Sequence, residues 1–359
     1  MTVIHLLSGA TGFIGGAVVL ELLRDPESEV YVLVRGQDPA HARRRLCNAL
    51  TAAATAYDAT PLWKSGEHRV HPVHGDVEAA LWGLDLPRAL PGGVRYIWHC
   101  AATLHYELHR AERIDSVNHH GARHAIDLAR RLGAQLNHMS TAYIAPSRDD
   151  GVLVEQPAVE QTAAPPTPYH HAKIRAERAV VESEIVWRIL RPSFVVGHAA
   201  THAATHHAGY YAMARRLTIA ARRHLVPEGA RAILPVPPDA TINLVPVDTV
   251  ARAAVAVGTL GETGTVYHLA NAEPPTSRSV LEALFAWTDL PRPEFGPPGE
   301  ARLPGPASAL QRYLPFFRVN QLDLDHTRRV TGSSAMATPL AAADLLAYLD
   351  CYKATLQAV

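Results

Sequence analysis

The amino-acid sequence predicts an α/β fold: a doubly wound parallel sheet followed by a smaller C-terminal α/β subdomain. Short apolar runs alternate with helical segments over residues 3–197, and the first run leads into a glycine-rich turn. Such alternation is typical of a parallel sheet with right-handed crossovers. From His198 an Ala- and His-rich segment breaks the alternation. At 359 residues the chain has room for two domains, or for one domain with a large appendage.

The composition excludes several classes of protein. Lys and Arg together number 34, as do Asp and Glu, so a net charge of zero gives no bulk attraction to nucleic acid or to an anionic membrane. The three cysteines are too scattered for a disulfide framework, and a reducing cytoplasm fits them best. No apolar stretch is long enough to span a membrane. Because the chain enters its first expected strand at once, we expect neither a signal peptide nor a preceding carrier or adenylating domain.

The turn after the first strand has the spacing of a dinucleotide site. Residues 3–7 are apolar, residues 13–23 have helical spacing, and three glycines lie between them at positions 9, 12 and 15. Glycine lets the chain turn sharply and lets a pyrophosphate approach the backbone at the helix N-terminus. We therefore expect a Rossmann-type nucleotide-binding turn, although such a turn can also serve only to pack strand on helix. The residues expected to line it are Gly9, Thr11, Gly12, Phe13, Ile14 and Gly15.

The second expected strand, residues 29–35, ends in an arginine. In this type of fold an acidic residue about 20 positions after the glycines binds the ribose 2′-hydroxyl of NAD. Here Arg35 stands at that position, and a guanidinium can hold a 2′-phosphate through charge-assisted hydrogen bonds. The sequence therefore favours NADPH; a solvated strand end is the alternative interpretation of Arg35. Arg45, on the helix expected over residues 40–56, is either a second ligand of the nucleotide or part of an exposed face.

Three further strands are expected over residues 70–74, 96–102 and 136–140. Their carboxyl ends lie at the edge where open parallel sheets bind ligands. Asp76 follows the first and can accept a hydrogen bond from the adenine amino group. The second runs into small residues, Ala101 and Ala102, where the backbone can lie against ribose and nicotinamide. The third delivers Thr141 and Tyr143.

Tyr169 and Lys173 lie four residues apart on an expected helix and therefore project from one face. A carbonyl that receives a hydride needs a proton donor and a preorganised hydrogen-bond donor at its oxygen. A free phenol titrates near pH 10, and a nearby ammonium lowers that pKa. We expect Tyr169 to be the proton donor, Lys173 to lower its pKa, and Thr141 to hold the substrate oxygen. A surface tyrosine beside a solvated lysine is the alternative.

A sixth strand is expected over residues 185–190. Residues 1–197 are predicted to form the nucleotide-binding domain, to which residues 240–270 return, and residues 198–239 and 271–359 the substrate-binding subdomain. The Pro/Gly-rich stretch 290–307 is either an ordered loop beside the substrate or disordered. Histidine pairs at helical spacing, such as His105/His109 and His202/His206, lack a placed carboxylate or cysteine partner, so we expect no metal site.

Several motifs, taken in order, resemble those of a known enzyme family. The glycine turn, Thr141, the Tyr169-x-x-x-Lys173 pair and Arg191-Pro192-Ser193 resemble the extended short-chain dehydrogenases/reductases over roughly the whole chain. A narrower set is similar to the thioester reductase and fatty acyl-CoA reductase ("male sterility") branch. That set comprises Leu33-Val34-Arg35 followed by Ala42-x-x-Arg45-Leu46, Gly75-Asp76-Val77 followed by Leu81-x-Gly83-Leu84, His99-x-Ala101-Ala102, Asn118-x-x-Gly121, Ser140-Thr141-Ala142-Tyr143 followed by Lys173-x-x-Ala176-Glu177, and Asn243-Leu244-Val245-Pro246-Val247-Asp248.

The resemblance implies a stand-alone enzyme that uses NADPH to reduce an acyl thioester, bound to CoA or to an acyl or peptidyl carrier protein, to an aldehyde or alcohol. It implies catalytic roles for Thr141, Tyr169 and Lys173. The other implied positions are Arg35 and Arg45 at the 2′-phosphate, Asp76 and Val77 at adenine, Ala101, Ala102 and Asn118 beside nicotinamide, and Pro192, Ser193 and Val195 in the loop that closes over that end. Arginines at 215, 216, 222 and 223 gather on one helix side and could receive an acidic carrier or CoA, or form a solvated face.

Two alternatives stay open. Another extended-family member, acting on a ketone, an alcohol or a nucleotide sugar, would use the same tyrosine and lysine. A non-catalytic NADP-binding scaffold would keep the fold without the chemistry.

Overall fold

The computed structural model describes residues 1–145, 147, 151–158, 167–223, 231–297, 300, 302–303, 305–311, 313–318 and 321–357. Its centre is a seven-stranded sheet in the order β11-β7-β5-β4-β1-β2-β3, in which every paired neighbour runs parallel. The strands are β1 Val3–Ser8, β2 Ser28–Val34, β3 Val70–His74, β4 Val94–His99, β5 Gln135–Met139, β7 Trp187–Pro192 and β11 Thr265–Leu269. This order confirms the predicted doubly wound sheet.

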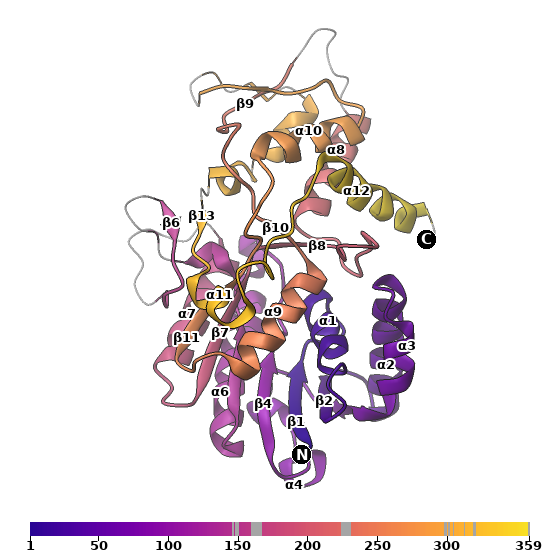
Figure 1. Cartoon of the computed structure of the whole chain (residues 1–359), viewed down its shortest axis with the longest axis vertical. Coiled ribbons are helices and arrows are strands. Elements are labelled where there is room, and N and C mark those ends of the chain that lie inside the picture. The colour runs from indigo at the N-terminus through magenta and orange to yellow at the C-terminus, as the bar shows by residue number, and fades with distance from the viewer. Residues whose placement is uncertain are drawn as a thin grey trace.

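Helices cover both faces of the sheet (Figure 1). Neighbouring residues of β1 show why: Leu6 and Leu7 are both fully buried but lie in different apolar clusters. A strand turns successive side chains to opposite faces, and apolar residues on both faces are typical of a covered parallel sheet. One cluster includes residues of α1 Phe13–Leu22, α2 Pro39–Ala56 and α9 Val247–Leu260, and the other includes residues of α6 Gly121–Leu132 and α7 Pro168–Val181.

A second core lies beyond the carboxyl ends of the strands, at the end of the molecule away from the N-terminus (Figure 1). It brings together α8 Tyr210–Arg223, α10 Ser277–Trp287 and α12 Ala342–Gln357 with the short parallel pairs β8–β10 and β9–β12. Strand bounds here are β8 Phe194–Val196, β9 Ile233–Leu234, β10 Leu244–Pro246 and β12 Glu294–Phe295. Leu324 and Met336 belong to the first core, so the chain returns to the sheet before α12. The division of the chain into two domains at residue 197 stays a prediction.

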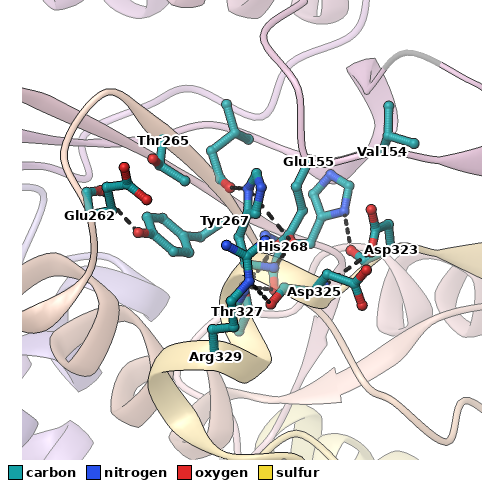
Figure 2. Close-up of polar contacts among 12 residues, drawn as sticks. Val154, Glu155, Glu262, Thr265, Tyr267, His268, Asp323, Asp325, Thr327 and Arg329 are labelled. Atoms are coloured by element: carbon teal, nitrogen blue, oxygen red, sulfur yellow. Dashed lines mark hydrogen bonds and ion pairs between the residues drawn. The ribbon is translucent and has the colours of Figure 1, made fainter.

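A buried carboxylate ties the C-terminal segment to the edge of the sheet (Figure 2). Glu155 is 2% exposed and follows the short strand β6 Val152–Leu153, which pairs with β13 Gln321–Leu322. It accepts hydrogen bonds from the backbone N–H of His268 at 2.7 Å and of His326 at 2.5 Å, and from the Thr327 hydroxyl at 2.7 Å. Burial raises the pKa of Glu155. The carboxylate thereby joins β6, β11 and α11 Asp325–Thr331.

The remaining described helices are α3 Thr60–Gly66, α4 Leu86–Ala89 and α5 Ala111–Asp115. None of the described helices combines the length and the apolar character needed to cross a membrane. Part of the stretch 290–307 lies outside the described residues; Gly305–Leu310 forms a 3-10 helix.

Candidate active site

The glycine turn between β1 and α1 is closed by its own backbone. The Gly12 N–H donates to the Gly9 carbonyl at 2.9 Å, and Gly9 has a φ of +87°, which favours glycine. A Cβ at Gly9 would lie 2.6 Å from the Ala101 nitrogen, so only glycine lets the turn approach the loop after β4 this closely. Gly12 caps α1 without a side-chain hydrogen bond, and Thr11, Phe13 and Ile14 are half-buried. The free first-turn N–H groups of α1 are suited to an anion.

Arg35 and Arg45 lie together at the end of β2. Arg45 donates from Nη1 to the Arg35 carbonyl, and the Arg35 side chain is 55% exposed. The Arg35 Nη1 is 4.0 Å from a carboxylate oxygen of Glu78, which also pairs with Arg113 and accepts from the Ser116 hydroxyl at 2.7 Å. A pair this long and exposed contributes little. The Arg35 guanidinium is therefore available to a phosphate at this strand end.

The expected adenine-side residues follow β3. The Asp76 carboxylate accepts from the Glu78 backbone N–H at 3.1 Å, so it turns back on its own loop. Val77 is buried, and its carbonyl lies 2.9 Å from Nδ1 of His124. Both residues lie at the same edge of the sheet as the glycine turn, because all seven strands run parallel.

Asn118 holds the loop that follows β4. It is 1% exposed and lies in a one-turn π-helix, Ser116–His120. Its side-chain oxygen accepts from the Thr103 N–H at 2.8 Å, and its amide nitrogen donates to the Thr103 carbonyl at 3.0 Å. Ala101 is half-buried and Ala102 is exposed. Asn118 thus fixes the path of the small-residue loop from the side; a π-turn of this kind is frequent at functional sites.

Lys173 contacts the end of β5, two residues before Thr141. Lys173 is 2% exposed, and its Nζ donates 2.8 Å to the carbonyl of Met139, the last residue of β5. Thr141 lies two residues farther along and is 8% exposed; its hydroxyl oxygen accepts from the Tyr143 N–H at 3.4 Å, which leaves the hydroxyl hydrogen free to donate. Burial lowers the pKa of Lys173 to about 8.

Tyr169 lies one turn before Lys173 on α7. The helix begins after Thr167, whose hydroxyl caps the His170 N–H, with Pro168 in the first turn. Tyr169 is 7% exposed and its ring centroid is 5.3 Å from that of Tyr106. Burial raises the pKa of Tyr169, and Tyr106 adds to the rise. This shift is opposite to the expected effect of Lys173, and it keeps the phenol protonated, the form that donates, at neutral pH.

One turn beyond Lys173 lies Glu177, which belongs to the Lys173-x-x-Ala176-Glu177 motif of the sequence but had no role assigned to it. Glu177 is fully buried and accepts from Arg191 twice, at 2.8 Å from Nε and at 2.5 Å from Nη2. Arg191 is on β7, so this paired contact fixes α7 against the sheet. The signal was available in part: Tyr169, Lys173 and Glu177 recur at intervals of four on one helix face.

The loop after β7 is held by two buried asparagines. Pro192 is buried at the end of β7, and the Ser193 hydroxyl donates to Oδ1 of Asn243 at 2.6 Å. Asn243 also donates from Nδ2 to the Asn271 carbonyl at 2.8 Å. Val195 is half-buried in β8 and pairs with Val245 of β10. These contacts set the direction in which the chain leaves the sheet for the second core.

The histidines at helical spacing do not gather around a shared ligand position. His202 lies 3.4 Å from a carboxylate oxygen of Asp344. Over the described ranges, Asp115, His119 and His120 bring their ligand atoms within 4.8 Å of one another, but Asp115 is also ion-paired with Arg175. The absence of a metal site stays a prediction.

Comparisons with known proteins identify the family of this chain. Residues 7–254 match the model of the male sterility protein family, which is an NAD-binding family. The aldehyde reductase lnaA of Aspergillus flavus is 28% identical over 288 residues, covering 73% of this chain and 25% of that protein. The chain therefore spans about a quarter of the length of that curated relative.

Two solved structures have a similar fold. The terminal R domain from the myxalamid PKS-NRPS biosynthetic pathway superposes with a TM-score of 0.74 at 23% identity, covering 99% of this chain and 91% of that chain. A thiolation-reductase di-domain from an archaeal non-ribosomal peptide synthetase gives a TM-score of 0.72 at 17% identity, covering 99% of this chain and 76% of that chain. With the match to the family model, the chain belongs to the male sterility protein family within the extended short-chain dehydrogenases/reductases, and it is an oxidoreductase with a nicotinamide nucleotide as cofactor.

Proposed function

We propose that this protein uses NADPH to reduce an acyl thioester to an aldehyde or alcohol. The observation that carries the proposal is the hydrogen bond from Lys173 to Met139, which places the lysine against the end of the strand that leads into Thr141. Tyr169 lies one turn away on the same helix, so a phenol, an amine and an alcohol come from one strand end and one helix. A carbonyl oxygen that gains negative charge needs donors arranged in this way.

The nucleotide-binding turn fits a dinucleotide. Gly12 brings no side chain to the N-terminus of α1, and the first turn of that helix carries no acidic residue. A Cβ at Gly15 would lie 2.3 Å from the Gly9 carbonyl oxygen, so the cradle depends on glycine. The N–H groups of this turn would hold the diphosphate, and Arg35 with Arg45 would hold a 2′-phosphate. The preference for NADPH over NADH rests on these two arginines.

The reaction balances without a covalent enzyme intermediate. The bound reduced nicotinamide supplies the hydride. The thioester carbonyl becomes a thiohemiacetal, whose C–S bond then breaks to give an aldehyde and a free thiol; one NADPH and one proton are consumed. A second hydride and a second proton would convert the aldehyde to an alcohol. Cys100 is not needed as a nucleophile, and burial raises the pKa of its thiol to about 12, which disfavours the reactive thiolate.

Each residue has a distinct task in this scheme. Thr141 donates its hydroxyl hydrogen to the carbonyl oxygen, and Tyr169 gives its phenolic proton to the same oxygen as charge develops. Lys173 donates to the Met139 carbonyl and so holds α7, and with it Tyr169, against the end of β5. Asn118 positions the loop on the nicotinamide side through Thr103.

A carrier protein is the proposed donor of the acyl group, with CoA as the alternative source of the same thioester. The likeness in fold to a structure named as a thiolation-reductase di-domain supports this partner. Arg215 and Arg222 are exposed on α8 and suit an acidic surface, whereas Arg216 is half-buried and donates to the Tyr313 hydroxyl at 3.1 Å. The side chain of Arg223 lies outside the described residues.

A substrate panel tests the proposal. NADPH oxidation is followed with one acyl group presented as a carrier thioester, a CoA thioester, a pantetheine thioester and the free acid, beside a ketone and a nucleotide sugar. We expect oxidation with the thioesters alone, with thiol released in proportion to the first hydride and aldehyde identified by mass. Turnover of the ketone or the nucleotide sugar without the thioesters would assign the chain to another reaction. NADPH binding without turnover of any substrate would favour a scaffold.

A further inference from the structure

Five aromatic rings from separate segments, that of Tyr169 among them, gather near Thr141. They form two groups. The Tyr143 ring centroid is 4.7 Å from that of Phe194 and 5.4 Å from that of Phe316, and Phe194 and Phe316 are 5.4 Å apart. The second group is the Tyr106–Tyr169 pair. We refer to Tyr106, Tyr143, Tyr169, Phe194 and Phe316 as the aromatic box.

His170 joins the two groups of rings. Its centroid lies 5.5 Å from Tyr169 and 6.1 Å from Phe316. Burial lowers the pKa of His170 to about 4, so it is an uncharged ring at neutral pH. The aromatic box is therefore lined by uncharged rings. Tilted and edge-on arrangements of this kind suit another flat, uncharged group.

The Tyr143 hydroxyl is the unusual feature of the aromatic box. It is buried and has no hydrogen-bond partner among the described residues. The nearby Phe194 backbone N–H acts on its oxygen, but that N–H already donates to the Asn243 carbonyl at 3.1 Å. The hydroxyl hydrogen is therefore a buried donor without an acceptor among the described residues. Leaving such a group unsatisfied costs folding free energy.

Tyr143 is close to Thr141 in the chain and contacts it through its backbone. The Tyr143 N–H donates to the Thr141 hydroxyl oxygen, so both residues belong to the same short 3-10 turn after β5. Tyr106 is 41% exposed and comes from a loop with no helix or strand, and its ring covers Tyr169. We therefore expect a substrate carbonyl at Tyr169 to have its acyl group near these rings.

We infer that the aromatic box binds the acyl group of the substrate, and that this group is uncharged, flat and aromatic or conjugated, with a carbonyl or ether oxygen that accepts a hydrogen bond from Tyr143. The identification of the ligand as an acyl group rests on the proposed function. Its flat, uncharged and hydrogen-bonding character rests on the rings and on the unmatched Tyr143 hydroxyl. The inference assigns Tyr143 to substrate selection and not to proton transfer, because the acceptor it serves is a second oxygen of the acyl group.

The test uses two pantetheine thioesters of aryl acyl groups. One carries a carbonyl in the acyl chain, and the other has a methylene at that position. Octanoyl-pantetheine is the aliphatic reference. Wild-type protein should favour the carbonyl-bearing aryl substrate over the methylene one by about tenfold in kcat/KM, the value of one hydrogen bond. Tyr143→Phe should remove that preference, so that its kcat/KM values for the two aryl substrates become equal. Tyr348→Phe is the matched control, because its hydroxyl is also buried without a partner among the described residues but lies in the second core.

Binding of the two corresponding aryl alcohols, measured by calorimetry with NADP+ present, separates this inference from the proposed function. Suppose that no thioester is reduced but that Tyr143→Phe still weakens binding of the carbonyl-bearing alcohol alone by about tenfold. The proposed reaction is then wrong, and the assignment of the aromatic box as a binding site is supported. Equal effects of Tyr143→Phe on both ligands, or a preference of the wild type for octanoyl over both aryl groups, would overturn the inference. Thermal melting of both variants checks that each is folded.

Discussion

Lys173 donates a 2.8 Å hydrogen bond to the carbonyl of Met139, at the last residue of the strand that leads into Thr141. The contact fixes one turn of α7 against β5, and it holds an ammonium group in a site that is 2% exposed. The distance between helix and strand thus depends on a charged group whose own pKa is lowered by burial. Activity should therefore report on the protonation of this lysine.

The pH profile of kcat/KM is expected to fall as the pH rises through about 8, the pKa of Lys173. A lysine is charged below its pKa, so most of Lys173 is protonated at pH 7 and its charge is lost at higher pH. Lys173→Arg should move the alkaline limb to higher pH, because a guanidinium keeps its charge there, although its maximal rate will be lower. An alkaline limb at the same pH in both proteins would show that another group sets it.

Arg35→Ala should raise the KM for NADPH by about 10- to 100-fold and leave that for NADH nearly unchanged, because a charge-assisted hydrogen bond to phosphate contributes about 1.5–3 kcal/mol. Arg44→Ala, at an exposed position on the neighbouring helix, is the matched control. Equal losses with both nucleotides would mean that Arg35 does not read the 2′-phosphate.

The buried pair of Glu177 and Arg191 should dominate the stability of the α7–sheet contact. Both side chains are 0% exposed, and removing one partner of a buried ion pair costs about 3–5 kcal/mol. Glu177→Gln is expected to lower the free energy of unfolding by that amount in urea. Glu182→Gln removes a carboxylate from the C-cap of the same helix, where the Glu182 side chain is 60% exposed and pairs with Arg178, and should cost less than about 1 kcal/mol.

A second pair of variants checks the origin of that loss. Replacing both partners, as in Glu177→Leu with Arg191→Met, leaves no uncompensated buried charge and should be less damaging than Glu177→Gln alone. If the double variant were less stable than Glu177→Gln, the loss of unfolding free energy in Glu177→Gln would have to come from packing and not from an uncompensated charge.

Buried histidines should make the protein sensitive to acid. Burial lowers the pKa of His5 and His170 to about 4 and that of His99 and His268 to about 3, while His138 lies well below its usual value. The unfolded chain takes up these protons near pH 6.5, so stability is complete above that pH and falls as the pH drops below it. Each residue contributes up to about 1.4 kcal/mol per pH unit in that range.

His138→Phe tests the acid response at one position. Neither ring nitrogen of His138 has a hydrogen-bond partner among the described residues, so the change removes a titrating group at no hydrogen-bond cost. The slope of unfolding free energy between pH 4 and pH 6 should decrease by about 1.4 kcal/mol per pH unit. His171→Phe, at an exposed position on α7, should leave the slope unchanged. An unchanged slope in His138→Phe would refute this origin.

Local patterns in the sequence were sufficient for the sheet and for much of the candidate site. The glycine turn, the alternation of strands and helices, and the Tyr169–Lys173 interval each depend on neighbours within a few positions. Contacts between distant segments were not predictable in this way. Glu155 meets residues more than 100 positions away, and β8 pairs with β10 and not with the main sheet. The sign of the Tyr169 pKa shift also depends on burial, which no local pattern gives.

The measurement closest to the central claim is single-turnover NADPH oxidation by Tyr169→Phe with a thioester that the wild type reduces. NADPH should bind with an unchanged Kd, while the rate of hydride transfer should fall by about 10²- to 10⁴-fold because the proton donor is missing. A Tyr169→Phe protein that reduces the thioester at the wild-type rate would contradict the account.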